Sequence, residues 1–351
     1  MATSKRVTLA DVARRAGLSS SAASMILNGR PDTRLSKDAH DRVNRAAAEL
    51  GYRPNVAARA LRVDKTQTIG FVSDTVATTR FASGLIKGAL AAAERAGHVI
   101  LVAETGGDHA RETEAIAALL DRQVDGIVFA ATRARELFIP ALQENVPVVL
   151  LNALNEHFPT SVLPDEERGG RAAVSLLAEA GHKEGIVLIG HNGVKERDVF
   201  RSTTVGRRLD GIRAEMKDRG LSFEREESIW DWEPQNGYAC VRDLLNEHPP
   251  PRALICLNDP LAFGAYQALT EKGLRVPEDV SIVSFDNDEI ASYLRPGLTT
   301  VALPHEEMGR LAVELLLAGA KGGEHLVNMP VVVRSSIAIT PSTWGVDTAR
   351  E

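Results

Sequence analysis

The stretch LSSSAASMILNG, residues 18–29, carries short hydroxyl and amide side chains that suit hydrogen bonding. Ser19 fits a helix N-cap, and a helix over 20–28 would turn Ala23 and Ile26 to one face and leave the serines facing out. Short polar side chains on such a first turn can reach base edges in the DNA major groove, and its free backbone N–H groups can meet phosphates. The alternative interpretation is an ordinary helix with a solvated serine face.

The surrounding elements would position this face as part of a helix-turn-helix. Thr8 and Asp11 form a capping-box pair, which predicts a first helix that ends before Gly17. A short turn through that glycine leads into the helix over 20–28, and a third helix is predicted over 37–50. The apolar positions of the first two helices can pack on each other.

The charge of the chain is divided unevenly. Residues 1–65 hold 13 Lys and Arg against 6 Asp and Glu, a balance of +7, whereas the remainder carries −13 of the total of −6. A basic head on an acidic body is typical of a polyanion-binding module attached to something else.

A second DNA-binding feature follows the head, in the segment YRPNVAARALR, residues 52–62. Pro54 at a first helical position and the alanines after it predict a short helix, too short to be stable alone. Leu61 lies between Arg59 and Arg62 with no obvious core to join. A helix that folds only on its partner can use such a leucine as a minor-groove wedge.

From Thr66 onward, apolar strands alternate with helices. Candidate strands lie at 69–72, 99–102, 126–129, 148–151, 185–189, 253–256 and 280–283. Candidate helices lie at 83–96, 111–122, 168–180, 206–219, 260–272 and 304–318. Unbroken apolar strands between helices predict parallel sheets that are covered on both faces, and the series breaks near 152–168, at a boundary between two subdomains.

Several classes of protein are disfavoured. No apolar run has the roughly 18 residues of a membrane span, and the polar N-terminus does not look like a secretory signal. Cys240 and Cys256 form no CxxC pair, and no GxxxxGK[ST], GxGxxG, GxSxG or HExxH motif occurs. We therefore expect a cytoplasmic, nucleoid-associated protein with no membrane association, no catalytic residues, no metal and no cofactor.

The segments VTLADVARRAGLSSSAASMILNG and AAAELGYRPNVAARALR resemble the DNA-binding head and hinge helix of the LacI/GalR family of transcriptional regulators. The resemblance covers essentially the whole chain. It implies an α/β fold with a helix-turn-helix domain (1–53), a hinge helix and linker (54–65), a body (66–341) and a tail (342–351). The body would be two-lobed and periplasmic-binding-protein-like, with doubly wound parallel sheets. The implied first lobe spans about 66–162 plus part of 293–321, and the second about 163–292 plus 322–340.

For DNA binding, the resemblance implies a homodimer on a near-palindromic double-stranded operator. It makes Ser20, Ser21 and Met25 the base-reading positions and Leu61 the intercalating leucine. Positions at or near the DNA backbone would be Thr8, Ser19, Ser24, Asn28, Tyr52 and Asn55. Arg59, beside the leucine, is a further predicted DNA-binding residue. Many family members have arginine or another polar residue where Met25 stands, and methionine cannot make the bidentate contact to guanine.

For the body, the resemblance implies a small-molecule effector between the lobes, beyond the carboxyl ends of the strands. Carboxylates, amides and an aromatic wall suit a sugar. The positions that strand ends and resemblance select are Ser73, Asp74, Phe81, Arg208, Trp232, Asn258 and Asp286.

Structural alternatives exist for three of these positions. Asn258 can cap a helix that begins near Pro260, Trp232 can belong to the lobe core, and Arg208 can pair with Asp210 or Glu215 on its own surface.

The resulting hypothesis is a sequence-specific transcriptional regulator of the repressor type, controlled by a sugar. Effector binding would change the angle between the lobes and so the spacing of the paired hinge segments. A solute-binding transport receptor with the same body fold is the alternative, and a cytosolic enzyme on the two-lobed scaffold is a third hypothesis. The short tail has no leucine heptads, which favours a dimer over a tetramer.

Overall fold

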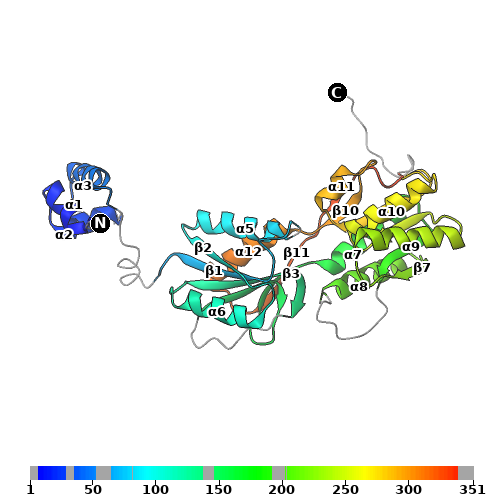
Figure 1. The fold of residues 1–351 in the computed structure, drawn as a ribbon, viewed down its shortest axis with the longest axis horizontal. Coiled ribbons are helices and arrows are strands. Elements are labelled where there is room, and N and C mark those ends of the chain that lie inside the picture. The colour runs from blue at the N-terminus through cyan, green and yellow to red at the C-terminus, as the bar shows by residue number, and fades with distance from the viewer. Residues whose placement is uncertain are drawn as a thin grey trace, which may run out of the picture. The chain divides into compact units, whose positions relative to one another are not determined.

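The structure is a computed structural model that describes residues 7–28, 35–52, 65–80, 82–136, 146–191, 202 and 204–338, with residues 133–136 and 191 described at the backbone only. The chain divides into two compact units, Met1–Thr66 and Gln67–Glu351 (Figure 1).

The first unit contains three helices, α1 (Leu9–Ala16), α2 (Ser20–Leu27) and α3 (Lys37–Leu50). The predicted capping box is confirmed, because the Thr8 side chain accepts a hydrogen bond from the backbone N–H of Asp11 while the Asp11 carboxylate accepts one from the backbone N–H of Thr8. The sequence therefore predicted both helices of the helix-turn-helix to within one residue.

The three helices share a small apolar core. Val12 of α1, Ala23 of α2 and Val43 of α3 are fully buried in it. Since Ala23 and Ile26 face this core, the opposite side of α2 faces away from the core of the head, as the helical spacing predicts.

The second unit contains two six-stranded sheets, and we call the sheets with their helices the first and second lobes. The first sheet has the strand order β11-β5-β4-β3-β1-β2, and its neighbouring strands are parallel. Its strands are β1 (Thr68–Ser73), β2 (Val99–Glu104), β3 (Gly126–Glu136), β4 (Val148–Leu154), β5 (Thr160–Pro164) and β11 (Gly323–Val327). Helices α5 (Ser83–Arg95) and α12 (His305–Ala318) cover one face, and α6 (His109–Leu120) covers the other (Figure 1).

The second sheet has the order β12-β10-β9-β8-β6-β7. Its strands are β6 (Ile186–His191), β7 (Phe223–Ser228), β8 (Ala253–Cys256), β9 (Ser281–Asp286), β10 (Thr299–Ala302) and β12 (Val331–Val332). All of its pairings are parallel except that of β12, which is antiparallel to β10. One face is covered by α7 (Glu166–Glu179) and α8 (Val205–Asp218), and the other by α9 (Pro234–Glu247) and α10 (Asp259–Glu271).

Two glycines set the distance between α7 and α8. A Cβ at Gly170 would overlap the carbonyl oxygen of Arg208, and a Cβ at Gly211 would overlap that of Glu167. The helices therefore approach closely enough for the first turn of α7 to meet the first turn of α8. This contact places Glu166 against Arg208.

The chain passes between the lobes three times, after β5, after β10 and after β11. One expectation is corrected here. Residues 322–340 were assigned to the second lobe, but β11 pairs in parallel with β5 in the first sheet. Only the last residue of β11 is buried, so this edge strand lacks the apolar run that would have revealed it.

Among the described residues, no helix is long and apolar enough to cross a membrane.

Candidate functional site

The outward side of α2 carries the residues predicted to read DNA. Ser20 and Ser21 are exposed on its first turn, and the Met25 side chain is 37% exposed one turn later. Ser19 is the N-cap, and its hydroxyl accepts a hydrogen bond from the backbone N–H of Ala22 at 3.2 Å. The arrangement presents two hydroxyls, one thioether and a helix N-terminus on one surface.

The remaining head positions have structural partners as well. Asn28 Nδ2 donates to the backbone oxygen of Ser24 at 2.6 Å and lies 3.2 Å from its hydroxyl. Thr8 caps α1, and Tyr52 packs against the head core. The predicted positions Asn55, Arg59 and Leu61 lie outside the described residues.

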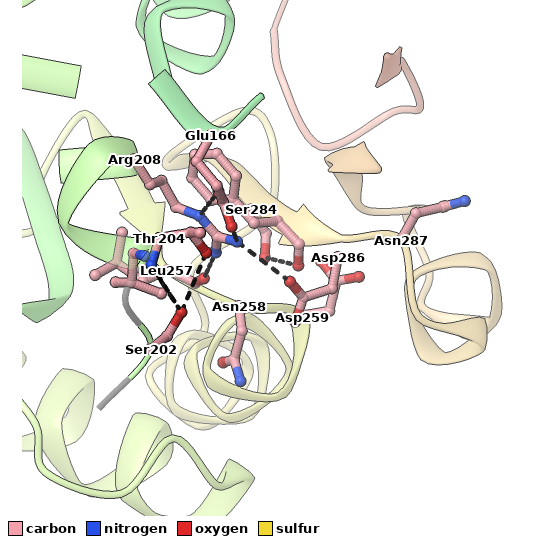
Figure 2. A network of polar contacts seen from close by, with 12 residues as sticks. Glu166, Ser202, Thr204, Arg208, Leu257, Asn258, Asp259, Ser284, Asp286 and Asn287 are labelled. Carbon is pink, nitrogen blue, oxygen red and sulfur yellow. Dashed lines mark hydrogen bonds and ion pairs between the residues drawn. The ribbon is translucent and has the colours of Figure 1, made fainter. Parts of the chain in front are cut away.

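In the body, Arg208 is the centre of a buried polar network (Figure 2). Its Nε and Nη2 donate to the two carboxylate oxygens of Glu166 at 2.6 and 2.9 Å, and its Nη1 donates to the carbonyl oxygen of Leu257 at 2.6 Å. Its guanidinium also lies over the Phe285 ring, 4.4 Å from the centroid. The alternative pairing with Asp210 or Glu215 is wrong, because the partner of Arg208 comes from α7.

Asp286 ends β9 beside this network. One carboxylate oxygen lies 3.8 Å from Arg208 Nη2, and the side chain is only 9% exposed. Burial raises the pKa of Asp286 to about 8, although the positive charge of Arg208 opposes the shift. The backbone is left-handed at Asp286 (φ 105°) and at Asn287 (φ 55°), an uncommon conformation for residues other than glycine.

Asp259, the residue after Asn258, anchors the loop after Asp286. Its Oδ1 accepts a hydrogen bond from the Thr300 hydroxyl at 2.8 Å, and its Oδ2 accepts one from the backbone N–H of Asp288 at 2.7 Å. Asp259 is fully buried, and burial raises its pKa to about 6. Sequence spacing could not reveal these partners, because the side chain reaches two other segments of the lobe.

Asn258 and Trp232 are joined at the same edge of the second sheet. Asn258 caps α10 by accepting from the backbone N–H of Leu261 at 2.9 Å, as the structural alternative predicted, and its Nδ2 donates to the Trp232 carbonyl at 3.1 Å. The Trp232 indole N–H donates to the Gly190 carbonyl at 2.9 Å, and its ring packs against both apolar clusters of the lobe. Trp232 is therefore partly core.

A neighbouring aromatic was not predicted. Trp230, two residues before Trp232 and just after β7, is 66% exposed. An exposed tryptophan at this edge can offer a flat apolar face to a sugar.

The first-lobe positions follow the carboxyl end of β1. Ser73 is buried, and its hydroxyl has no hydrogen-bond partner within the described part of the chain. Asp74 Oδ1 accepts from the Thr132 hydroxyl at 2.7 Å, from the Thr132 backbone N–H at 3.0 Å and from the Thr75 backbone N–H at 2.6 Å. Asp74 thus organises the loop, and Phe81 lies outside the described residues.

Two ion pairs join the lobes near the polar network. Arg80 of the first lobe pairs with Glu289 of α11 (Glu289–Tyr293). Arg207 of α8 makes a bidentate pair with Glu324 of β11, with distances of 2.7 and 3.1 Å. A cavity of about 150 Å³ lies beside the first pair, lined by Arg80, Asp286, Asn287, Asp288, Glu289, Leu303 and His305. Among the described residues, no group of three His, Cys, Asp or Glu could hold a metal ion.

Known protein families match both parts of the chain, the helical head and the two-lobed body. The family description "Bacterial regulatory proteins, lacI family" matches residues 8–55, and "Periplasmic binding protein-like domain" matches residues 174–337. The chain is 30% identical to the ribose operon repressor of Escherichia coli (strain K12) over 338 residues, which cover 95% of this chain and 97% of that protein. The chain belongs to the lacI family.

Other relatives of this lacI-family protein agree. The transcriptional repressor PurR of Vibrio cholerae is 31% identical, over 91% of this chain and 93% of the relative. Among solved structures, the lac repressor dimer bound to operator and an anti-inducer has a TM-score of 0.74 at 28% identity, covering 96% of this chain and 100% of that one. The CelR–cellobiose complex has a TM-score of 0.62 at 27% identity, covering 94% and 100%.

The resemblance and the fold class predicted from the sequence are thereby confirmed. The lacI-family chain is a DNA-binding transcriptional regulator, with a helix-turn-helix head and an effector-binding body of the periplasmic-binding-protein type. The roles of individual site residues remain predictions.

Proposed function

We propose that this regulator is a repressor that binds a near-palindromic operator as a homodimer and responds to a small sugar held between its lobes. The observation that carries the proposal is the buried Arg208–Glu166–Asp286 network at the carboxyl edge of the second sheet, in a chain that also has a DNA-binding head. Ligands of open α/β sheets bind at this edge. No catalytic step is part of the proposal, since the relatives are repressors.

On DNA, α2 would enter the major groove with Ser20, Ser21 and Met25 toward the base edges. Ser19, at the helix N-terminus, is well placed for a phosphate, because free backbone N–H groups gather there. Four other residues of the head would likewise lie at or near the DNA backbone: Thr8, Ser24, Asn28 and Tyr52. The segment 54–65 would supply Asn55, Arg59 and the Leu61 wedge between the head (1–53) and the body (66–341), with 342–351 as a tail.

In the body, the Asp286 carboxyl group would hydrogen-bond to sugar hydroxyls, with Arg208 holding the group in place. Asn258 and Trp232 border the same edge, and Ser73, Asp74 and Phe81 would face the ligand from the first lobe. The names of two relatives point to carbohydrates, since one represses a ribose operon and another was solved with cellobiose.

The homodimer is supported by the edge strand β2. Val99 and Val102 are 63% and 44% exposed on this strand, and Leu90 of the adjacent α5 is also exposed. An apolar, unpaired strand edge invites pairing with another chain. The lac repressor relative was solved as a dimer. A dimer with two heads fits an operator with two half-sites.

Selection from random duplex DNA tests the proposal. The full chain should enrich a sequence with two inverted half-sites, and a chain with Ser20→Ala and Ser21→Ala should lose that enrichment. Enrichment of no sequence, or the same enrichment by both proteins, would contradict the DNA-binding role assigned to α2.

A further inference from the structure

The chain enters the body at Gln67, one residue before β1, and its backbone there is left-handed (φ 55°). Glutamine rarely adopts this conformation, whereas asparagine, aspartate and glycine adopt it more readily. Such a residue persists only where its surroundings hold it, and it often marks a functional point of the fold. Gln67 lies two residues after the segment 54–65, which the proposed function makes the hinge helix and linker.

Both backbone polar groups of Gln67 are hydrogen-bonded. Its N–H donates to Asp125 Oδ2 at 2.9 Å, and its carbonyl oxygen accepts a hydrogen bond from the backbone N–H of Val99, also at 2.9 Å. The backbone N–H of Asp125 donates in turn to the carbonyl oxygen of Thr68 at 2.7 Å. Gln67 is thereby tied to the first residue of β2 and to the residue before β3. These bonds fix the direction in which the preceding chain meets β1.

Asp125 is itself held in place and largely shielded from water. It lies in the turn between α6 and β3, where Gln123 also has a left-handed backbone (φ 54°) and donates its N–H to the Leu120 carbonyl at 2.8 Å. The side chains of Asp125 and His98 are 9% and 12% exposed, and His98 Nε2 lies 3.5 Å from Asp125 Oδ2. A hydrogen bond to a carboxylate is strong where water has little access, so the bond to Gln67 is a firm anchor.

The anchored residue also lies beside the edge strand β2, which the proposed function places in the dimer interface. Val99, which binds the Gln67 carbonyl, is the first residue of that strand and is exposed. In a dimer that pairs through β2, both linkers would therefore join the body next to the interface. The body, rather than the linker, would then set where the two linkers start and in which direction they run.

We propose that Asp125 is a positioning residue: by binding the backbone N–H of Gln67, it fixes the direction of the linker and so the half-site spacing that the dimer accepts on DNA. The inference rests on the proposed function, since it needs a homodimer on two half-sites. One extra base pair between half-sites moves one of them by about 3.4 Å along the duplex and turns it by roughly 35°. Two heads on anchored linkers cannot follow this change, whereas heads on loosened linkers can.

Two substitutions break the anchoring hydrogen bond from opposite sides. Asp125→Ala removes the acceptor, and Gln67→Pro removes the donor and forces a negative φ. Two control substitutions leave the bond in place. Gln67→Asn keeps the N–H and tolerates a left-handed backbone. Asp108→Ala removes another carboxylate of the first lobe that accepts from a backbone N–H, that of Arg111 in the first turn of α6.

The first experiment measures hydrogen exchange of the Gln67 amide in the full chain, without DNA. We expect the amide to be protected in the wild type and to exchange at least ~10-fold faster in Asp125→Ala, with Asp108→Ala unchanged. An amide that exchanges equally fast in the wild type and in Asp125→Ala would overturn the proposal.

The second experiment measures operator affinity by fluorescence anisotropy, with the selected operator and with versions whose half-sites are one or two base pairs closer together or farther apart. The wild type, Gln67→Asn and Asp108→Ala should prefer the selected spacing by at least ~10-fold, and Asp125→Ala and Gln67→Pro by less than ~3-fold. A bond that only stabilises the fold would lower the affinity equally at every spacing, and that result would refute the positioning role. If Asp125→Ala does not fold, Gln67→Pro decides the matter.

The two experiments separate this inference from the proposed function. If the wild type enriches no DNA sequence, the proposed function fails, while hydrogen exchange still decides whether Asp125 anchors Gln67. If the wild type selects two half-sites and the anchor variants keep its spacing preference, the proposed function stands and the positioning role of Asp125 is wrong.

Discussion

Asp286 combines a buried carboxyl group with a left-handed backbone, two features that each cost stability. Such combinations persist where they serve a site. Asparagine tolerates positive φ nearly as well as aspartate does, so Asp286→Asn removes the charge and leaves the backbone requirement in place. The residue is therefore a clean probe of what the charge contributes.

Asp286→Asn should stabilise the body, and more so as the pH rises. The pKa of Asp286 is raised to about 8 in the folded chain, so between pH ~4 and ~8 the folded state holds a proton that the unfolded state has lost. The free energy of unfolding of the wild type therefore falls as the pH rises through this window. The variant has no group that titrates at this position, so its stability does not fall for this reason. Thermal unfolding at pH 5 to 8.5 should show a gain of about 1 kcal/mol or more near pH 8.

Asp243→Asn is the matched control, because Asp243 is an exposed aspartate on α9. Asp243→Asn should not give the gain in stability at pH 8 that Asp286→Asn gives. A body that Asp286→Asn destabilises at pH 8 would contradict the raised pKa of Asp286.

Met25→Arg tests base reading on α2. The exposed methionine offers only apolar contact, whereas arginine can bind guanine through two hydrogen bonds worth about 1–3 kcal/mol of discrimination. We expect the selected operator to gain guanine at one position in each half-site. Identical consensus sequences for both proteins would show that residue 25 does not face a base.

Several candidate site residues could be selected from the sequence, but the residues to which they hydrogen-bond could not. Arg208, Asn258 and Asp286 were all selected, because family resemblance and strand ends mark them. The acid that neutralises Arg208 is Glu166, 42 residues away on another helix. Its place depends on the close approach of α7 and α8, which is a property of packing.

At the scale of elements, the two lobes are held by the three chain crossings and by pairs such as Arg207–Glu324. The crossings contain backbone hydrogen bonds from Asp165 N–H to the Val327 carbonyl and from Ala302 N–H to the Pro330 carbonyl, both at 2.8 Å. Exchange of these two amides with solvent reports how readily the crossings open.

Glu324→Gln should speed the exchange of the Asp165 and Ala302 amides. The pair is partly exposed, so its loss is worth about 0.2–1 kcal/mol, or a roughly 1.4- to 5-fold faster exchange by mass spectrometry. Glu226→Gln breaks a comparable pair with Arg213 inside the second lobe and should leave both amides unchanged. Equal exchange in the two variants would show that Arg207–Glu324 does not hold the lobes.

The edge strand β2 should be part of the dimer interface. Val99→Lys and Val102→Lys together would place two charges on an apolar edge, which prevents strand-edge association. Light scattering should show that this double variant is a monomer, while Val333→Lys, at an exposed valine in the second lobe, stays dimeric. A dimeric double variant would place the interface elsewhere.

Elements with a strong hydrophobic periodicity could be predicted from the sequence, and short elements could not. The helices of the head and most strands of the two sheets follow from capping residues and apolar runs. Strand β5 was missed because Pro159 precedes it and Pro164 is its last residue, although all five of its residues are buried. Strand β11 was missed because it lies at an edge, where burial leaves little trace in the sequence.

At the scale of the whole molecule, the basic head is suited to DNA binding and the acidic body to ligand binding. The balance of +7 over residues 1–65 suits the negatively charged DNA backbone, while the −13 of the remainder disfavours nonspecific contact of the body with DNA. Coupling between them needs only about 1–3 kcal/mol, which changes operator affinity by roughly 5- to 150-fold.

The most direct test is the affinity of the full chain for its selected operator, measured by fluorescence anisotropy against random DNA of equal length, with and without a body ligand. We predict at least ~1,000-fold preference for the operator at physiological salt, and a change of at least ~5-fold in operator affinity when the ligand saturates the body. Equal affinity for operator and random DNA, or an operator affinity that no saturating ligand alters, would contradict a ligand-controlled repressor.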